Sequence, residues 1–327
     1  MTDVTTAPPA RRPEALEPGP SPAREPRGSV LHRVRDSLLR QTYRDFEWII
    51  VDNASTDGTD ELVAGWIAEG SLPIRYLRNA EDLGFQGSWR RAVDEARGEL
   101  FLFVRSADEI VPEALERLLW HWRSIPDAER ASFSAVTALA VDEHGTLNGS
   151  PFPRDVLDSD SIEIRYRYKV RGEKFGFQRT DVLRSTRIPD PPGFRGAVPA
   201  SVTWKAIARR YRTRYVNEVL RVYWQDQAVS LSHPAVAWTD APGRLLDAES
   251  TIDHDVRWIL QAPVPVFRDA VAYVTSSLHT GRGLADQWRR LNGIGSRALW
   301  AAAVPAGVAF YGLQRYLSPI ARRLPSP

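Results

Sequence analysis

The feature that most constrains the fold is the stretch Glu-Trp-Ile-Ile-Val-Asp-Asn-Ala-Ser-Thr-Asp-Gly-Thr at residues 47–59. Residues 48–51 are an unbroken apolar run, typical of a strand covered on both faces in a parallel sheet between helices. The run ends on the carboxylate of Asp52, and after a turn a helical pattern begins at Thr59. Because ligands of open α/β sheets bind outside the carboxyl ends of strands, Asp52 is a candidate binding residue. The simpler alternative is that Asp52 only closes the turn, and for Asp57 we expect a helix-capping role.

The composition is that of a globular protein. With 327 residues, 43% of them hydrophobic, the chain can hold one large domain or two ordinary ones. Acidic and basic residues are interspersed and the net charge is only +2, so we expect no nucleic-acid partner. The absence of cysteine excludes disulfides, a thiol nucleophile and a cysteine zinc site, and it fits a reducing cytoplasm. The N-terminus lacks the apolar core of a signal peptide, so we do not expect export by that route.

The first half of the chain is predicted to be an arm followed by alternating strands and helices. Residues 1–28 are rich in Pro, Arg and Ser and almost without large apolar side chains, which predicts a disordered arm. An amphipathic helical pattern then runs from Val30 to about Gln41. The strand patterns that follow lie at 48–51, 74–77 and 100–104, and the helical ones at 59–69, 88–96 and 112–123. Such alternation predicts parallel strand pairing through crossover helices.

The second half changes character. Strand patterns lie at 134–141, 162–168, 174–177 and 214–223, a Pro- and Gly-rich loop at 188–196, and helical patterns at 201–211, 243–261, 266–279, 284–291 and 298–313. Within 162–168, apolar and charged residues alternate, as in a half-exposed antiparallel edge strand. We therefore expect three parts: an arm at 1–28, an α/β domain at 29–232 and a helical region at 233–327.

The terminal apolar segment, residues 298–313, has two interpretations. It is interrupted by Pro305 and Gly307 and is shorter than the roughly 20 residues that a spanning helix needs. Arginines flank it on both sides: Arg289, Arg290, Arg297, Arg315, Arg322 and Arg323. These arginines suit peripheral contact with an anionic membrane face. The alternative is a terminal helix packed on its own domain, and the sequence leaves both open.

Several short motifs occur in a characteristic order. Residues 36–43 read Asp-Ser-Leu-Leu-Arg-Gln-Thr-Tyr, and residues 52–59 read Asp-Asn-Ala-Ser-Thr-Asp-Gly-Thr. Further motifs lie at 78–79, 83–85, 98–102, 106–109, 172–174, 179–183 and 215–223. Together they resemble the family 2 glycosyltransferases over about residues 36–232. The resemblance implies the GT-A fold, a Rossmann-like α/β architecture with a mixed central sheet flanked by helices, with the helical C-terminal region added to it.

The resemblance also implies a chemistry, the inverting transfer of a sugar from a nucleoside diphosphate to an acceptor hydroxyl. In the family, the acid at the strand end, here Asp52, holds the base or ribose by accepting hydrogen bonds. The nucleotide-sugar-binding residues would be Asp52, Asn53, Ser55, Asn79, Asp82, Gly84 and Arg105. An Asp-x-Asp motif binds Mg²⁺ or Mn²⁺ to neutralise the leaving diphosphate, and a further acid is the general base.

The chain departs from the family pattern at the metal motif. Where members read Asp-x-Asp-Asp, this chain has Arg105, Ser106, Ala107 and Asp108. Asp108 is then the remaining metal ligand and one of two catalytic candidates. Arg105 could oppose the diphosphate charge itself, because a guanidinium forms paired bonds to phosphate oxygens. The alternative for Arg105 is a surface ion pair.

Two further departures concern the first strand and the general base. The family's opening strand should precede the helix at Val30, where this chain has its arm, so one central strand and part of the nucleotide floor are expected to be missing. Relatives often place a Glu at the position of Ala200, which cannot accept a proton. Asp190, in the nearby loop, is the substitute that we assign as the second catalytic candidate.

The leading hypothesis is therefore a glycosyltransferase that uses a nucleotide-sugar donor. Its acceptor would be a cell-surface glycan, a lipid-linked sugar or a small molecule, and it would act in the bacterial cytoplasm or at the inner face of the membrane. The competing hypothesis is a catalytically silent relative that binds a nucleotide, a glycan or a partner transferase. A third is a truncated product whose sheet is incomplete.

Overall fold

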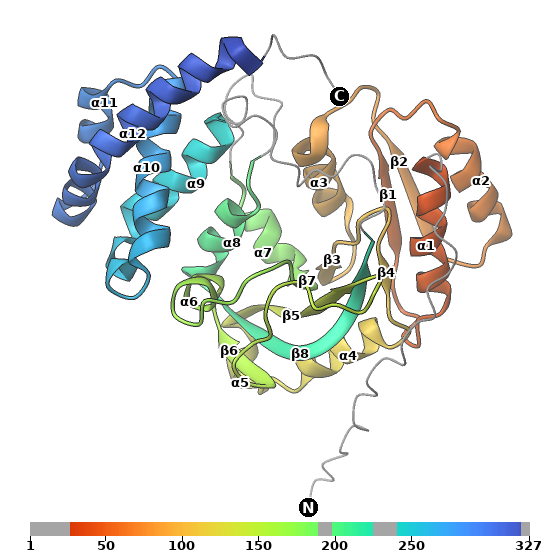
Figure 1. Cartoon of the computed structure of the whole chain (residues 1–327). Coiled ribbons are helices and arrows are strands. Elements are labelled where there is room, and N and C mark those ends of the chain that lie inside the picture. Colours follow the sequence, from red (N-terminus) through yellow and green to blue (C-terminus); the bar gives the residue numbers. More distant parts are fainter. Residues whose placement is uncertain (1–26, 189–197, 225–240, 322–327) are drawn as a thin grey trace, which may run out of the picture.

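The chain forms two β-sheets with helices around them, and a group of helices packs at one side (Figure 1). The computed structural model describes residues 27–188, 198–224 and 241–321. Almost all of the predicted arm, the predicted loop after Ile188 up to residue 196, and the predicted domain boundary at 232–233 lie outside these residues.

The smaller sheet has two parallel strands, β1 (Trp48–Asp52) and β2 (Ile74–Arg78), in which Trp48 lies opposite Ile74. Helix α2 (Thr59–Glu69) connects them and has the bounds that the sequence predicts. Both ends of α2 are glycines in the left-handed region, Gly58 with φ 81° and Gly70 with φ 68°. The crossover unit predicted here is therefore confirmed.

The larger sheet has six strands of mixed direction. They are β3 (Leu100–Leu102), β4 (Glu109–Ile110), β5 (Phe133–Asp142), β6 (Val156–Ser159), β7 (Phe175–Arg179) and β8 (Arg212–Tyr223). The order is β3-β7-β5-β8-β4, and β6 also pairs with β8. Only β5 and β8 are parallel. The mixed sheet is as predicted, but parallel pairing of the strand at 100–104 is wrong, because the partner of β3 is the antiparallel strand β7 from the second half of the chain.

β1 and β3 are both edge strands of their sheets. Among the described residues, β1 bonds only to β2, and β3 bonds only to β7. Trp48 on β1 and Leu100 on β3 pack against the same core, yet both are only partly buried. A central strand of a covered parallel sheet would be buried on both faces. The expected absence of the family's first strand stays a prediction, because residues 1–26 lie outside the described part of the chain.

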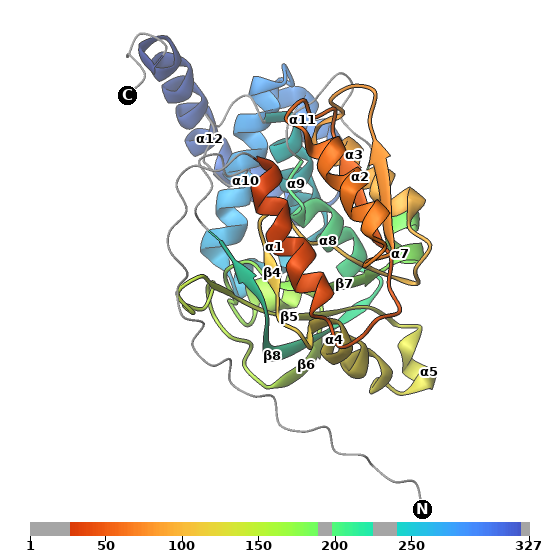
Figure 2. The same cartoon turned by 90° about the vertical axis from the view of Figure 1, so that its right-hand side faces the viewer.

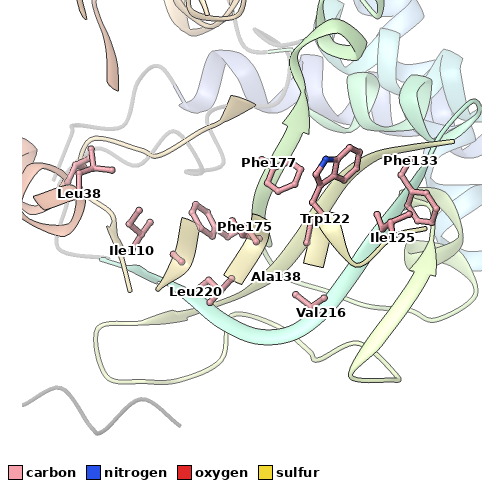
Figure 3. Close-up of a cluster of buried hydrophobic side chains, with 14 of the residues drawn as sticks. Leu38, Ile110, Trp122, Ile125, Phe133, Ala138, Phe175, Phe177, Val216 and Leu220 are labelled. Carbon is pink, nitrogen blue, oxygen red and sulfur yellow. The ribbon is translucent and has the colours of Figure 1, made fainter. Parts of the chain in front are cut away.

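The main core lies where helices and strands of both sheets converge (Figure 3). Leu38 from the first helix, Trp122, Phe177 and Leu220 all contribute to it, each less than a tenth exposed. The helices packed around the sheets are α1 (Arg27–Leu39), α3 (Gly84–Glu95), α4 (Ala114–Arg123), α5 (Asp127–Arg130), α7 (Thr180–Ser185) and α8 (Ser201–Ala208). The helices predicted from amphipathic spacing are present, with bounds shifted by a few residues.

The segment predicted as a strand at 162–168 is wrong, because it forms helix α6 (Ser161–Tyr166). Asp160 caps this helix and accepts hydrogen bonds from the backbone N–H groups of Ile162 and Glu163, both at 2.8 Å. Ile162 and Tyr166 pack against the C-terminal helices, whereas Ile164 packs toward the sheet. Because the helix is buried on two faces, its apolar residues alternate as they would in a strand.

The C-terminal region is a bundle at the side of the sheets opposite α1 and α2 (Figures 1 and 2). Its members are α9 (Ala241–His254), the 3₁₀ helix η1 (Val256–Leu260), α10 (Pro263–His279), α11 (Leu284–Arg290) and α12 (Ile294–Ala321). The predicted interruption of α12 is absent. Gly307 instead permits close packing on α10, since a Cβ there would come within 2.6 Å of Val274. No described helix combines the length and apolar character needed to cross a membrane.

Buried ion pairs join this bundle to the sheet domain. Lys205 on α8 donates to Asp247 at 2.8 Å and to the hydroxyl of Thr251 at 2.6 Å. Arg209 donates to Asp255 at 3.0 Å. Lys205 and Asp255 are almost fully buried. Removing one partner of such a pair leaves an uncompensated charge, so the contact fixes the position of α9 against α8.

Strand β8 is tied to helix α4 through Glu218. The carboxylate accepts from Arg117 Nε at 2.8 Å and from His121 Nε2 at 2.7 Å. Burial alone would raise the pKa of Glu218, but the hydrogen bonds from Arg117 and His121 outweigh it and hold that pKa at about 2. The group is therefore charged in the folded chain over the whole range in which an unfolded glutamate protonates.

This depressed pKa predicts an acid-sensitive contribution to stability. Ionised Glu218 stabilises the fold fully above pH 4.5, its ordinary pKa, and the contribution is lost as pH falls toward about 2. We expect Glu218→Gln to lower the free energy of unfolding by about 3 kcal/mol at pH 7 and by much less at pH 2.5. Urea unfolding across this range measures the difference. The exposed Glu113→Gln is the control, and a Glu218→Gln deficit that does not change with pH would contradict the assignment.

Candidate functional site

Asp52 lies at the carboxyl end of β1, and its side chain is bound inside the chain. One carboxylate oxygen accepts from the backbone N–H of Ser55 at 2.9 Å, and the other from the hydroxyl of Tyr76 at 2.6 Å. Arg78 Nε lies 3.6 Å from the same oxygen as Tyr76. Burial alone would raise the pKa of Asp52, but Ser55, Tyr76 and Arg78 hold it below its usual range. Asp52 is thus an ionised, buried acid that holds the following loop in place.

The next residue, Asn53, joins that loop to the start of α3. Its side-chain oxygen accepts from Asn79 Nδ2 and from the backbone N–H of Leu83, both at 2.9 Å. Its side-chain nitrogen donates to Asp82. The same Asp82 oxygen accepts from the N–H of Gly84 at 2.8 Å. The ends of β1 and β2 and the beginning of α3 are therefore linked by polar side chains at one edge of the small sheet.

The local sequence explains this arrangement. Gly84 has φ 67°, a conformation that favours glycine, and it lets the chain turn into α3 directly after Asp82. Asn79 is buried, and its backbone N–H donates to the carbonyl of Asp52 at 2.8 Å. Asp82 is exposed, and Asn53 and Ser55 are half-buried. We call the six residues Asp52, Asn53, Ser55, Asn79, Asp82 and Gly84 the donor loop network.

A second cluster of charged side chains surrounds Asp108. One carboxylate oxygen of Asp108 lies 2.6 Å from Arg221 Nη2 and 3.3 Å from Arg105 Nε. The Asp108 side chain is 2% exposed and that of Arg221 7%. Burial raises the pKa of Asp108, and the two guanidinium groups oppose that shift. The buried carboxylate thus has two cationic partners from its own chain.

Glu173 and Tyr223 complete this cluster on its outer side. A carboxylate oxygen of Glu173 lies 3.1 Å from Arg105 Nη2 and 3.3 Å from Arg221 Nη2. The guanidinium carbon of Arg105 lies 4.4 Å from the centre of the Tyr223 ring. We call Arg105, Asp108, Glu173, Arg221 and Tyr223 the arginine cluster.

The structure thus divides the predicted site residues into two sets. Six of the seven predicted nucleotide-sugar-binding residues form the donor loop network. The seventh, Arg105, belongs to the arginine cluster with Asp108, while Asp190 lies outside the described residues. The ion pair considered for Arg105 exists, but its partner Asp108 is buried. Sequence reasoning missed Arg221, for which the available signal was a charged residue between the apolar pairs 219–220 and 222–223.

Asp108 is the residue that the sequence assigns to the family's divalent cation, and in this structure arginines surround it. The carboxylate that remains from the motif is buried and already neutralised by two guanidinium groups. Within the part of the chain that the structure describes, no group of three or more His, Cys, Asp or Glu could hold a metal ion. The two carboxylates of the cluster, those of Asp108 and Glu173, are both paired with arginine.

Part of the sequence matches a known protein family and several of its relatives. Glycosyl transferase family 2 matches residues 24–131. The abequosyltransferase RfbV of Salmonella typhimurium is 37% identical over 71 residues, which are 22% of this chain and 21% of RfbV. The GalNAc(5)-diNAcBac-PP-undecaprenol beta-1,3-glucosyltransferase of Campylobacter jejuni is 22% identical over 197 residues, 59% of this chain and 60% of that protein. The chain thus spans about a fifth and about three fifths of the lengths of these relatives.

The fold is shared with a solved structure. The crystal structure of S. aureus TarS 1–349 in complex with UDP superposes with a TM-score of 0.55, covering 90% of this chain and 89% of that one at 18% identity. A likeness at this identity shows the fold. The family match therefore covers residues 24–131, about a third of the chain, and the shared architecture shows that the chain has the GT-A fold.

Proposed function

We propose that this protein transfers a sugar from a nucleoside diphosphate donor to an acceptor hydroxyl. The observation that carries the proposal is the donor loop network, which gathers polar side chains at the carboxyl ends of β1 and β2. This edge is where α/β sheets bind ligands. The match of residues 24–131 to glycosyl transferase family 2 supports the reaction class.

The burial of the network suggests a division of roles. Asn53, Ser55 and Asp82 are at least partly exposed, and their carboxylate, amide and hydroxyl groups can pair with the N–H and O–H groups of a base and ribose. Asp52 and Asn79 are buried, so in this proposal they hold the contacting residues in place. Arg105 would pair with the diphosphate, because a guanidinium binds phosphate oxygens in a forked geometry.

The proposed reaction is an inverting displacement. The acceptor oxygen attacks the anomeric carbon, a general base takes the hydroxyl proton, and the nucleoside diphosphate leaves. Ala200, directly before α8, has no side chain that can accept a proton. Asp190 is our proposed base, on the grounds of sequence position alone.

Nucleotide binding tests the donor loop network. We expect isothermal titration to show binding of UDP or GDP, and Asn53→Ala to weaken it about tenfold or more, since that change costs about 1.4 kcal/mol or more in lost hydrogen bonds. Thr56→Ala, at an exposed position of the same loop, should bind as the wild type does. Equal affinity of both variants would remove the network from the nucleotide site.

Donor turnover tests the base. Asp190→Ala should reduce sugar transfer or donor hydrolysis by about 10²-fold or more while leaving nucleotide affinity unchanged, because a base acts on the chemical step. The readout is nucleoside diphosphate released from a panel of UDP- and GDP-sugars. Asp127→Ala, on the exposed helix α5, is the control. An unchanged rate in Asp190→Ala would end this assignment.

A second candidate is a catalytically silent relative that binds a nucleotide or glycan. Two observations favour it: the only acid left from the metal motif, Asp108, is engaged by two arginines, and Ala200 occupies the family's base position. Nucleotide binding without donor turnover across the sugar panel would distinguish this candidate from an active transferase.

The proposed acceptor is a glycan, a lipid-linked sugar or a small molecule, met in the cytoplasm or at the inner membrane face. The Campylobacter relative is named for an undecaprenol-linked substrate, which supports a lipid-linked acceptor. Helix α12 supports peripheral membrane contact through residues 298–313, because Phe310 and Leu313 are about half exposed at 52% and 51%. The exposed Arg315 follows them on the same helix.

Vesicle binding tests that contact. The full chain should co-sediment with vesicles containing anionic phospholipid, and replacing both Phe310 and Leu313 by Ser should weaken binding about tenfold, since each apolar side chain contributes about 1 kcal/mol or more. Ile67→Ser, at an exposed apolar position of α2, should have no effect. Equal sedimentation of all three proteins would rule out contact through α12.

A further inference from the structure

We infer that the arginine cluster replaces the divalent cation of the family, so that Arg105 and Arg221 bind the donor diphosphate without metal after it displaces Glu173. This inference rests on the proposed function, because it concerns the diphosphate of the same donor. It differs from the family pattern in the source of the positive charge, which here is part of the polypeptide.

The Asp108 carboxylate is buried and already paired with two guanidinium groups. Its carboxylate oxygen is 2.6 Å from one guanidinium nitrogen and 3.3 Å from another, and its side chain is 2% exposed. A cation at this carboxylate would have to displace Arg221 and would lie beside two positive charges. Asp108 therefore acts as the buried counter-ion that keeps both arginines in place, and as a positioning residue.

The charges of the arginine cluster cancel, but its two carboxylates differ in exposure. Arg105 and Arg221 carry two positive charges, and Asp108 and Glu173 carry two negative ones. Asp108 is buried, whereas the Glu173 side chain is 44% exposed and lies on the outer side of both arginines. Glu173 is thus the anion that a ligand from solvent can replace, and a diphosphate offers oxygens in the paired arrangement that guanidinium groups bind.

Arg105 and Arg221 each have an N–H group that makes no aligned hydrogen bond. In the described part of the chain, neither Arg105 Nη2 nor Arg221 Nε makes an aligned hydrogen bond, although both atoms are buried. The contact of Arg105 Nη2 with Glu173 is an ion pair at 3.1 Å without that alignment. Buried donors are normally satisfied, so these N–H groups are suited to donate to phosphate oxygens once the Glu173 side chain moves away.

Backbone contacts and an aromatic ring hold the arginine cluster in place. The backbone next to Glu173 is held by Gly172, which has φ 82° and lies so close to the Asn148 carbonyl that a Cβ would come within 2.2 Å of its oxygen. The N–H of Glu173 donates to the side chain of Asn148 at 3.0 Å. The main chain is therefore fixed while the exposed carboxylate can rotate. Tyr223 lies against the guanidinium of Arg105 and limits the movement of that side chain.

The experiment is isothermal titration of the full chain with UDP and GDP, in EDTA and again in Mn²⁺. We expect dissociation constants that agree within twofold between the two conditions. Arg105→Ala should weaken binding at least tenfold in both, and Arg105→Lys should recover only part of it, because lysine lacks the forked geometry. Glu173→Gln should tighten binding severalfold by removing the competing anion. Glu129→Gln, the same charge change on helix α5, should have no effect.

The outcomes separate this inference from the proposed function. Binding that requires Mn²⁺ would overturn the inference and leave the proposed transferase intact. Absence of binding in both conditions would overturn both. Unchanged or weaker binding by Glu173→Gln would show that Glu173 does not compete with the ligand, which also overturns the displacement step. The comparison of EDTA with Mn²⁺ uses the wild-type chain, so it does not depend on whether any variant folds.

Discussion

The hydrogen-bonded strand β8 is the element on which the rest of the structure depends. It pairs with β5 in parallel and with β4 and β6 in antiparallel fashion, so it connects most of the larger sheet. Its register with β5 shifts at several points, which lets one long strand follow the curvature of the sheet. The same strand carries Glu218 toward α4 and Arg221 toward Asp108. Sheet geometry and site geometry are therefore set by one backbone element.

Paired buried charges are the second principle of this fold. Lys205 meets Asp247, Arg209 meets Asp255, and Arg221 meets Asp108. Losing one partner of a buried pair costs about 3–5 kcal/mol, because the remaining charge stays in a poorly solvated place. The first two pairs position the helical bundle. The third pair holds the Arg221 guanidinium next to Glu173. In our proposal this structural ion pair also positions Arg221 for binding the donor diphosphate.

The positions of some elements were predictable from the sequence. The strand at Trp48 and the helix from Thr59 to Glu69 were found as predicted, because their patterns are local and end in turn residues. The helix at Ser161–Tyr166 was not, since burial on two faces gives strand-like alternation. Gly307 was taken as an interruption and proved to be a packing contact, which depends on the neighbouring helix α10. Errors of this kind arise wherever a neighbour distant in sequence decides what a residue contacts.

The order of short motifs along the chain was enough to suggest glycosyl transferase family 2 and to name the polar residues after β1 and β2 as candidate binding residues. Their hydrogen bonds to one another depend on the fold, because parallel pairing brings the carboxyl ends of β1 and β2 to one edge of the sheet. The partners of Asp108 were decided by tertiary structure alone. Arg221 and Glu173 come from distant segments, and only the antiparallel pairing of β4 with β8 brings Arg221 beside that carboxylate. Whether an acid binds a metal or an arginine depends on which charges lie within a few ångströms, and that distance is a property of the folded chain.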